Sequence, residues 1–345
     1  MKPLRSLGLA AALSVLLAPG ARAADAPRIP MHDPVMCREN GIYYIFATGP
    51  GIAVWSSPDL EHWTHEKPVF ASPPAWIAQA LPQYRARSGY WAPDISFYGG
   101  QYYLYYAVSV FGKNTSCIGL ATNRTLDPRS PDFHWVDRGK VVQSFPGRTN
   151  WNAIDPNLVT DQAGHPYLVF GSFWEGIKLA RLAPDRLSLA ESPDHLPTIA
   201  SRIKTPGGPN PPAPEGNPAD AGGNAIEAPF IFRHGGWYFL FASIDYCCRG
   251  PKSTYKMIVG RSRSVAGPYV DREDVPLAHG GGDLVLAGDR THWYAVGHCA
   301  VGDFDGASYI VFHGYDAADN GRSKLRIMAL DWDAAGWPSV GAEKY

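Results

Sequence analysis

Short, nearly continuous apolar runs separated by turn residues recur along the chain. The most aromatic of these runs cover residues 42–47, 101–107, 166–170, 237–242 and 292–296. Runs of this length with few polar interruptions are typical of strands that are buried on both faces. Further strands are expected from Ile52, Ile118, Ile177 and Ile258 onward, and over residues 308–313 and 326–330. The pattern therefore predicts many short antiparallel strands.

An acidic residue stands at the start of each predicted unit of strands. The acids are Asp33, Asp94, Asp155, Glu227 and Asp283, and the intervals between them are 61, 61, 72 and 56 residues (94−33, 155−94, 227−155, 283−227). A two-sheet sandwich would explain the strands, but it would not explain a repeat of roughly sixty residues. We predict an all-β, five-bladed β-propeller, a single domain with the catalytic site in its central cavity.

The first residues resemble an export signal. Lys2 and Arg5 are basic, residues 7–18 are apolar but too short to span a bilayer, and residues 21–23 form a small-x-small cleavage site. We therefore predict a signal peptide over residues 1–23 and a propeller over residues 24–345. The mature protein is expected to be secreted or periplasmic, with no membrane-spanning segment.

The longest interval between acids contains a segment rich in Pro and Gly, at about residues 205–222. Such residues cannot hold a strand ladder. Because the repeat resumes in phase at Glu227, this segment is interpreted as a loop inserted into the propeller. Its end lies close enough to Glu227 to reach the rim of the cavity.

Charge and composition limit the partners. Lys and Arg total 31 against 32 Asp and Glu, so no nucleic-acid partner is expected. Aromatic residues make up 12% of a nearly neutral chain, which suits a neutral polysaccharide. The protein is expected to be a monomer.

Five cysteines are present, so at least one is unpaired within the chain. Cys247 and Cys248 are adjacent. They can form a vicinal disulfide, which export would permit, or can be two small buried side chains in a tight turn. Both interpretations remain open from the sequence.

Three of the unit starts are more polar than a strand start requires: residues 32–34 (HDP), 152–156 (NAIDP) and 224–229 (NAIEAP). Cleavage of a glycosidic bond needs one carboxylic acid to protonate the leaving oxygen, and a second carboxylate as nucleophile or base. A third carboxylate can keep the acid protonated through like-charge repulsion. A purely structural role at strand starts accounts for one such acid more readily than for three.

These segments resemble glycoside hydrolase family 43, and within it the endo-1,5-α-L-arabinanases. The similar motifs extend over nearly the whole predicted mature chain: HDP (32–34), WAPD (91–94), NAIDP (152–156), SFWEG (172–176), EAP (227–229), CCRG (247–250), STY (253–255) and GH (297–298). The resemblance implies that Asp33 is the general base, that Glu227 is the general acid, and that Asp155 tunes the pKa of the acid and orients it. It also implies inversion of the anomeric configuration.

The resemblance further implies which residues contact the sugar: Asp33, Trp91, Gly112, Asn152, Ala153, Ile154, Asp155, Ser172, Phe173 and Trp174. Trp91, Trp174 and Trp151 are candidate stacking platforms, and ordinary blade packing is the alternative for each. Asp94 and Asp283 are interpreted as structural.

The last implied site is a metal site. The resemblance places one Ca²⁺, or another hard cation such as Na⁺, near His298. Water is expected to complete most of its shell, because an imidazole is a poor sole ligand for a hard cation. The alternative is an ordinary core histidine. Cys299 follows His298, where many relatives have a small polar residue.

We therefore expect an exported enzyme that cleaves internal α-1,5-L-arabinofuranosidic bonds of arabinan or of pectin side chains. An exo-acting β-xylosidase or α-L-arabinofuranosidase of the same family is the alternative. Such enzymes usually close one end of the cleft with an additional C-terminal domain, whereas Tyr345 directly follows the last predicted blade. A non-catalytic sugar-binding propeller is disfavoured by the presence of all three carboxylates.

Overall fold

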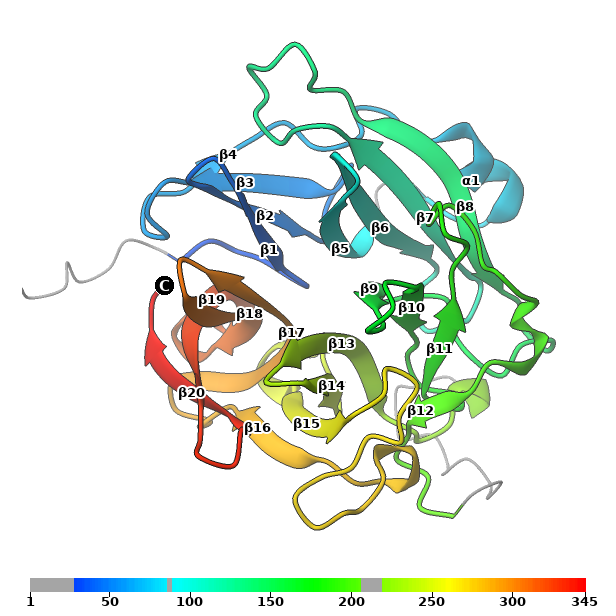
Figure 1. Cartoon of the computed structure of the whole chain (residues 1–345), viewed down its shortest axis with the longest axis vertical. Helices are drawn as coiled ribbons and strands as arrows, with labels where there is room; N and C mark the ends of the chain where they lie inside the picture. The colour runs from blue at the N-terminus through cyan, green and yellow to red at the C-terminus, as the bar shows by residue number, and fades with distance from the viewer. Residues whose placement is uncertain (1–27, 86–88, 206–218) are drawn as a thin grey trace, which may run out of the picture.

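Five four-stranded antiparallel sheets surround one axis, as Figure 1 shows. This computed structural model describes residues 28–85, 89–205 and 219–345. The architecture confirms the predicted five-bladed β-propeller. The predicted signal peptide and most of the predicted insertion lie outside the described residues.

Each blade runs outward from the axis in chain order. Blade 1 contains β1 (Val35–Glu39), β2 (Ile42–Ala47), β3 (Ala53–Ser57) and β4 (Thr64–His65). Blade 2 contains β5 (Trp91–Tyr98), β6 (Gln101–Ser109), β7 (Ser116–Asn123) and β8 (Val136–Ser144). Blade 3 contains β9 (Asn157–Thr160), β10 (Pro166–Phe170), β11 (Ile177–Arg181) and β12 (Thr198–Ala200). Blade 4 contains β13 (Ile226–His234), β14 (Trp237–Ile244), β15 (Lys256–Ser262) and β16 (Asp283–Ala287). Blade 5 contains β17 (Trp293–Phe304), β18 (Ala307–Asp316), β19 (Arg322–Trp332) and β20 (Pro338–Glu343).

Helical segments are short and lie between strands. The α-helix α1 (Ala75–Ala80) connects blades 1 and 2. The 3₁₀ turns among the described residues are η2 (Pro193–His195), η3 (Ala219–Ala221), η4 (Gly250–Lys252), η5 (Leu277–His279) and η6 (Ala317–Asp319). In the part of the chain that the structure describes, no helix has both the length and the apolar character needed to cross a membrane.

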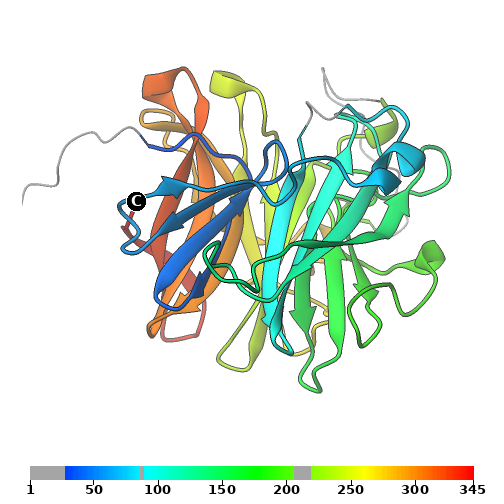
Figure 2. The ribbon, with the colours of Figure 1, turned by 90° about the horizontal axis from the view of Figure 1, so that it is seen from above.

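The blades close into a ring through their innermost strands. Each of β1, β5, β9 and β13 contacts the innermost strand of the next blade, and β17 contacts β1. The segment that precedes β1 also pairs with the last blade: the N–H of Met31 donates to the carbonyl of Ser323 (3.1 Å), and that of Leu325 to the carbonyl of Ile29 (2.9 Å). Figure 2 shows the same blades from the side. The first and last blades are therefore held together by backbone hydrogen bonds.

The middle strands are almost entirely buried because neighbouring blades cover both of their faces. Tyr105 in β6, Phe241 in β14 and Phe312 in β18 have no exposed surface. Burying a large apolar side chain of this kind stabilises the fold by roughly 1.5–3 kcal/mol. This two-sided burial explains why these strands read as continuous apolar runs rather than as alternating ones.

The fifth unit was predicted incorrectly. Asp283 begins β16, the outermost strand of blade 4, where it accepts a hydrogen bond from the N–H of Arg272 (2.8 Å). Residues 292–296, expected to form the second strand of blade 5, overlap its innermost strand, β17. An outer strand can carry the same short apolar run as an inner one, so the pattern alone did not separate them. The innermost strand of blade 5 presents His298, and not an acid, to the cavity.

Asp94 connects two blades rather than lining the cavity. Its carboxylate, on β5, accepts hydrogen bonds from the side-chain amide of Asn157 (3.0 Å) and from the N–H of Leu158 (2.8 Å), both on β9. Burial raises the pKa of Asp94 to about 6, although these two donors oppose the shift. These contacts are consistent with the structural role expected for Asp94.

Candidate active site

A cavity of about 690 Å³ opens at the end of the ring where the innermost strands of blades 1 to 4 begin. Every blade contributes to its wall. The five residues that show this are Asp33, Trp91, Asp155, Glu227 and His298, one from each successive blade. The repeat therefore brings together three acids that lie far apart in the sequence.

The cavity wall includes all the predicted sugar-contact residues except one: Asp33, Trp91, Gly112, Asn152, Ile154, Asp155, Ser172, Phe173 and Trp174. Ala153 lies in the core, fully buried, and its N–H donates to the hydroxyl of Ser144 (3.0 Å). Trp151 also packs in the core, edge-to-face against Phe170, with 5.5 Å between ring centroids. The structure thus places Trp151 in ordinary blade packing, the alternative to a stacking platform for sugar.

Three side chains surround the carboxylate of Asp33. The Nδ1 atoms of His32 and His298 lie 2.7 and 3.0 Å from its Oδ1, and the hydroxyl of Thr48 donates to its Oδ2 (2.6 Å). Burial by itself would raise the pKa of Asp33. The two histidines outweigh burial and hold this pKa well below its ordinary value. Asp33 is therefore ionised near neutral pH and can accept a proton.

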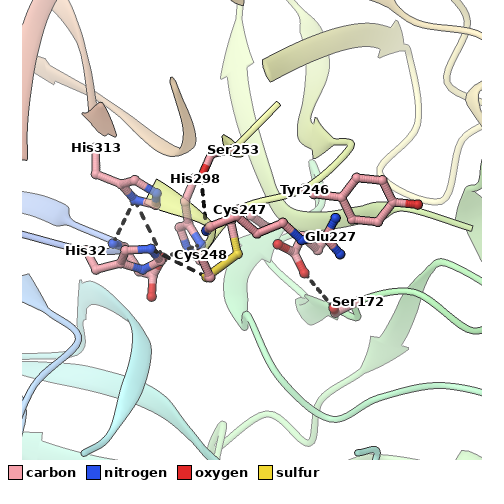
Figure 3. Close-up of a disulfide and its surroundings, with 12 residues drawn as sticks. His32, Ser172, Glu227, Tyr246, Cys247, Cys248, Ser253, His298 and His313 are labelled. Atoms are coloured by element: carbon pink, nitrogen blue, oxygen red, sulfur yellow. Dashed lines mark hydrogen bonds and ion pairs between the residues drawn. A yellow bond between two sulfur atoms is a disulfide. The ribbon is translucent and has the colours of Figure 1, made fainter. Parts of the chain in front are cut away.

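Behind Asp33, a hydrogen-bond network fixes the tautomer of His313 and orients the ring of His32. The N–H of Asp33 donates to Nδ1 of the fully buried His313 (3.1 Å), so the proton of that neutral ring is on Nε2, which faces the hydroxyl of Tyr315 (3.3 Å). Burial lowers the pKa of His313 well below its usual value and keeps the ring neutral. Nε2 of His32 lies 2.9 Å from the same hydroxyl, and its Nδ1 faces Asp33. The two imidazoles also stack, 3.8 Å apart (Figure 3).

Glu227 and Asp155 form the second group of acids. The hydroxyl of Ser172 donates to Oε2 of Glu227 (2.6 Å), and the N–H of Ala228 donates to Oδ2 of Asp155 (3.0 Å). Burial raises the pKa of both carboxyls, and the charge of Glu227 raises that of Asp155 further. The pair therefore binds a proton more tightly than an exposed carboxyl does.

The cavity thus combines an ionised carboxylate with a carboxyl pair that retains a proton. Opposite shifts of this kind allow one group to accept a proton while another donates one at the same pH. The hydrolysis of an acetal bond requires one group of each kind, a proton acceptor and a proton donor. Perturbed pKa values gathered in one cleft are also typical of active sites.

Several cavity residues have left-handed backbone conformations that are uncommon for residues other than glycine. Their φ angles are +52° at Asp33, +57° at Asp155, +55° at Phe173, +43° at Trp174 and +56° at His298. Such conformations cost of order 1–3 kcal/mol each and cluster at functional sites. These five residues and Cys248 (+65°) lie along the wall of one cavity.

His298 lies at a bulge in β17, and its N–H donates to the hydroxyl of Ser243 (2.8 Å). Burial disfavours its charged form, but the nearby carboxylates, Asp33 first, raise the pKa of His298 to about 9. Within the described residues, the two clusters of three possible metal ligands are His32, Cys247 and Cys248, and His32, Asp33 and His313. Neither includes His298. A cation here would be held by one imidazole and water, with Asp33 orienting the ring and no protein cage, and it would have to displace the proton that the carboxylates stabilise on that ring.

Two aromatic residues at the cavity were not singled out from the sequence. Phe111, two residues beyond the end of β6, lines the cavity with 73% of its surface exposed, and its ring centroid lies 6.5 Å from that of Trp91. Tyr246 lines the cavity from blade 4 and lies near Phe173, with 6.0 Å between ring centroids. An aromatic side chain placed just beyond a strand end is the signal that would have indicated them.

Cys247 and Cys248 form a disulfide that also lines the cavity (Figure 3). Cys248 is exposed and Cys247 is half-buried. Two buried side chains, one of the two interpretations left open, are therefore ruled out. The remaining thiols, Cys37, Cys117 and Cys299, are free.

The end of the predicted insertion reaches the cavity wall. Ala221 lines the cavity, and the N–H of Trp174 donates to its carbonyl (3.2 Å). Residues 206–218 of this segment lie outside the described residues.

Comparison with known proteins agrees with this geometry. The chain is 44% identical over 318 residues to an extracellular exo-α-(1→5)-L-arabinofuranosidase of Cellvibrio japonicus, covering 92% of this chain and 88% of that one. It is 39% identical over 340 residues to an extracellular endo-α-(1→5)-L-arabinanase of Bacillus subtilis, covering 97% and 95%. Its fold matches that of the Cellvibrio cellulosa α-L-arabinanase complexed with arabinohexaose, with a TM-score of 0.84, 44% identity, and coverage of 91% and 96%.

The sequence profile of the glycosyl hydrolases family 43 matches residues 28–338. This span includes the innermost strand of every blade, and with it all three acids of the cavity. The chain is a member of glycosyl hydrolases family 43.

Proposed function

We propose that this protein hydrolyses internal α-1,5-L-arabinofuranosidic bonds of arabinan with inversion of the anomeric configuration. One observation carries the proposal: the ionised Asp33 and the proton-retaining pair of Asp155 and Glu227 line the same cavity. The substrate class is supported by relatives that are named for α-1,5-L-arabinan bonds.

In the proposed mechanism, Asp33 is the general base and Glu227 the general acid. Asp33 takes a proton from a water molecule, and the water oxygen forms a bond to the anomeric carbon. The bond between that carbon and the leaving oxygen breaks, and Glu227 gives its proton to that oxygen. Inversion requires the two carboxyl groups to leave room for the water, which in such enzymes corresponds to roughly 6.5–9.5 Å between them.

Asp155 is proposed to keep Glu227 protonated and to orient it. Asp155 accepts a hydrogen bond from the N–H of Ala228, the residue that follows Glu227. This contact fixes the backbone from which the Glu227 side chain projects. Repulsion between the two carboxylates also disfavours the state in which both are ionised.

Aromatic and polar residues are proposed to bind the sugar units. Trp91, Phe173 and Trp174 line the cavity and offer faces on which sugar C–H groups can pack. Asn152 is oriented by the hydroxyl of Ser116, which donates to its side-chain oxygen (2.6 Å), so its amide N–H groups remain for sugar hydroxyls. Gly112 brings backbone to the cavity wall.

A largely hydrated hard cation, Ca²⁺ or Na⁺, is proposed to bind at His298. When bound, it would supply positive charge close to the carboxylates. The contact between Nδ1 of His298 and Asp33 fixes the ring, and Nε2 is the nitrogen that would hold the ion.

An exo-acting α-L-arabinofuranosidase is the second candidate, because a relative of that name is 44% identical to this chain. Internal cleavage is favoured by the spread of aromatic residues across the cavity, to which all five blades contribute. Trp91 and Phe111 lie on blade 2 and Tyr246 lies on blade 4, and these two blades are not adjacent in the ring. The extracellular relatives also support the proposal that this enzyme is exported. We expect it to be a monomer.

The test is to incubate the protein with linear arabinan and follow both the viscosity and the sizes of the products. A fast loss of viscosity with mixed oligosaccharides supports internal cleavage. Short products of a single size with slow loss of viscosity would establish exo action. Release of sugar from an aryl β-xyloside, with no action on arabinan, would contradict the proposed substrate. Binding of arabinan without hydrolysis would identify a sugar-binding propeller.

A further inference from the structure

The disulfide between Cys247 and Cys248 occupies an unusual position. It lies in the loop between β14 and β15, and both residues line the cavity that contains the three acids. Cysteine is ordinarily among the most buried residue types. Here Cys248 is exposed, whereas the buried free thiols Cys117 and Cys299 are inside blades. An exposed disulfide in the wall of a sugar-cleaving cavity needs a physical explanation.

The loop holds the disulfide in place from both sides. The N–H of Cys248 donates to the hydroxyl of Tyr315 (2.8 Å). On the far side, the N–H of Arg249 donates to the hydroxyl of Ser253 (3.0 Å), and the N–H of Thr254 donates to the carbonyl of Tyr246 (2.9 Å). The sulfur atoms are therefore presented by a fixed loop, so little ordering is required when a ligand packs against them.

The disulfide also lies close to the proposed base. The Sγ atom of Cys248 is 3.8 Å from Nε2 of His32, and the other nitrogen of that ring bonds Asp33. Figure 3 shows the disulfide among His32, His298 and Glu227. A sugar unit in contact with these sulfur atoms would thus be at, or next to, the bond that is cleaved.

The chemistry of a disulfide suits this position. It has no S–H group and no titratable proton, so it neither competes for the carboxylates nor adds charge to the cavity. Sulfur is polarisable and packs well against apolar groups. Two adjacent sulfur atoms form a smaller apolar surface than an indole or phenyl ring, and so allow a sugar to approach the acids closely.

Stabilisation of the folded chain is a weaker explanation. A disulfide stabilises mainly by restricting the unfolded chain, and its effect grows with the length of the loop that it closes. The bond between Cys247 and Cys248 joins neighbours in the sequence and closes the shortest loop possible. Its contribution through chain entropy is therefore the smallest that a disulfide can make.

We propose that the Cys247–Cys248 disulfide is a sugar-binding surface, against which the C–H face of an arabinofuranose unit packs beside the proposed base. This inference rests on the proposed function. The hydroxyl groups of that unit remain for the polar residues of the cavity.

The test compares the binding of arabinohexaose by calorimetry in a Glu227→Gln parent, which is expected to bind without turnover. The double variant Cys247→Ala/Cys248→Ala in this parent removes the sulfur surface, and Cys117→Ala is the matched control that removes one buried sulfur that does not line the cavity. We expect the double variant to raise Kd about tenfold or more, while the melting temperature changes little. The control should leave Kd unchanged.

An unchanged Kd in the double variant, with a lower melting temperature, would overturn the proposal and leave the disulfide a structural feature. A second measurement covers the case in which the double variant does not fold. Reduction of the parent by a phosphine converts the disulfide to two thiols, with the phosphine oxidised, and reoxidation restores it. Binding that weakens on reduction and recovers on reoxidation supports the sugar-binding surface; binding that is the same in both forms contradicts it. If the intact parent does not bind arabino-oligosaccharides, the proposed substrate is wrong and this inference fails with it.

Discussion

The backbone N–H of Asp33 donates a hydrogen bond to Nδ1 of His313, 3.1 Å away, although the two residues are 280 positions apart. Asp33 precedes the first strand of blade 1, and His313 lies in β18 of blade 5. The bond exists because the ring closes between these two blades. Together with the stacking of His313 on His32, it holds the proposed base in one orientation.

We expect His32→Ala to move the acidic limb of the kcat/KM profile to higher pH. His32 holds the pKa of Asp33 down through its charge and its hydrogen bond, so its removal raises that pKa. A base that must be ionised then requires a higher pH. His62→Ala is the matched control, because His62 pairs with Asp59 on the surface. An acidic limb at the parent position in both variants would show that His32 does not tune Asp33.

We expect Asp33→Asn and Glu227→Gln each to lower turnover of arabinan by roughly two to four orders of magnitude while leaving the fold intact, because each removes one proton-transfer group. The two variants should differ on an aryl arabinofuranoside whose leaving group has a low pKa. Glu227→Gln should recover activity there, since such a leaving group needs no proton, and Asp33→Asn should not. Equal recovery would mean that the roles are assigned wrongly.

We expect Asp155→Asn to lower kcat and to move the alkaline limb of the pH profile to lower pH. An anionic Asp155 disfavours ionisation of Glu227, so without that charge the acid loses its proton at a lower pH. The measurement is kcat/KM against pH, with circular dichroism to check folding. If the rate falls and the alkaline limb stays in place, Asp155 acts only in positioning.

We expect a strong chelator to reduce turnover of the wild-type protein, and His298→Ala to do the same with little change in melting temperature. His298→Gln should retain part of the activity, because an amide oxygen suits a hard cation. An inactive His298→Ala variant combined with a chelator-insensitive wild type would assign the effect to the imidazole on Asp33, without an ion. A variant that melts several degrees lower but is fully active would identify a core histidine.

We expect Asp94→Ala to lower the free energy of unfolding by about 1–3 kcal/mol without changing turnover per folded molecule. The substitution leaves the N–H of Leu158 and the amide of Asn157 without their shared acceptor between blades 2 and 3. Denaturant unfolding measures the loss. Asp283→Ala on the outer strand β16 is the control and should cost less. A large loss of activity per folded molecule in Asp94→Ala would instead indicate a role at the cavity.

Local pattern was sufficient to predict much of this fold. The strands β2 and β10 have the bounds that the apolar runs predicted, because strands packed between two blades admit few polar residues. The spacing of Asp33, Asp155 and Glu227 followed the size of one blade, and this placed them around a common axis. The same reasoning failed at Asp283, since an outer strand can be as apolar as an inner one.

The sequence determined which acids, aromatics and strands are available, because these depend on residue type and on spacing within a single blade. Only the tertiary structure decided how they are paired. The contact of Asp33 with His313, the approach of His298 to Asp33 and the approach of Cys248 to His32 all depend on closing the ring between its first and last blades. Residues so distant in the chain have no local pattern in common, so their contacts follow from the packing of the blades alone.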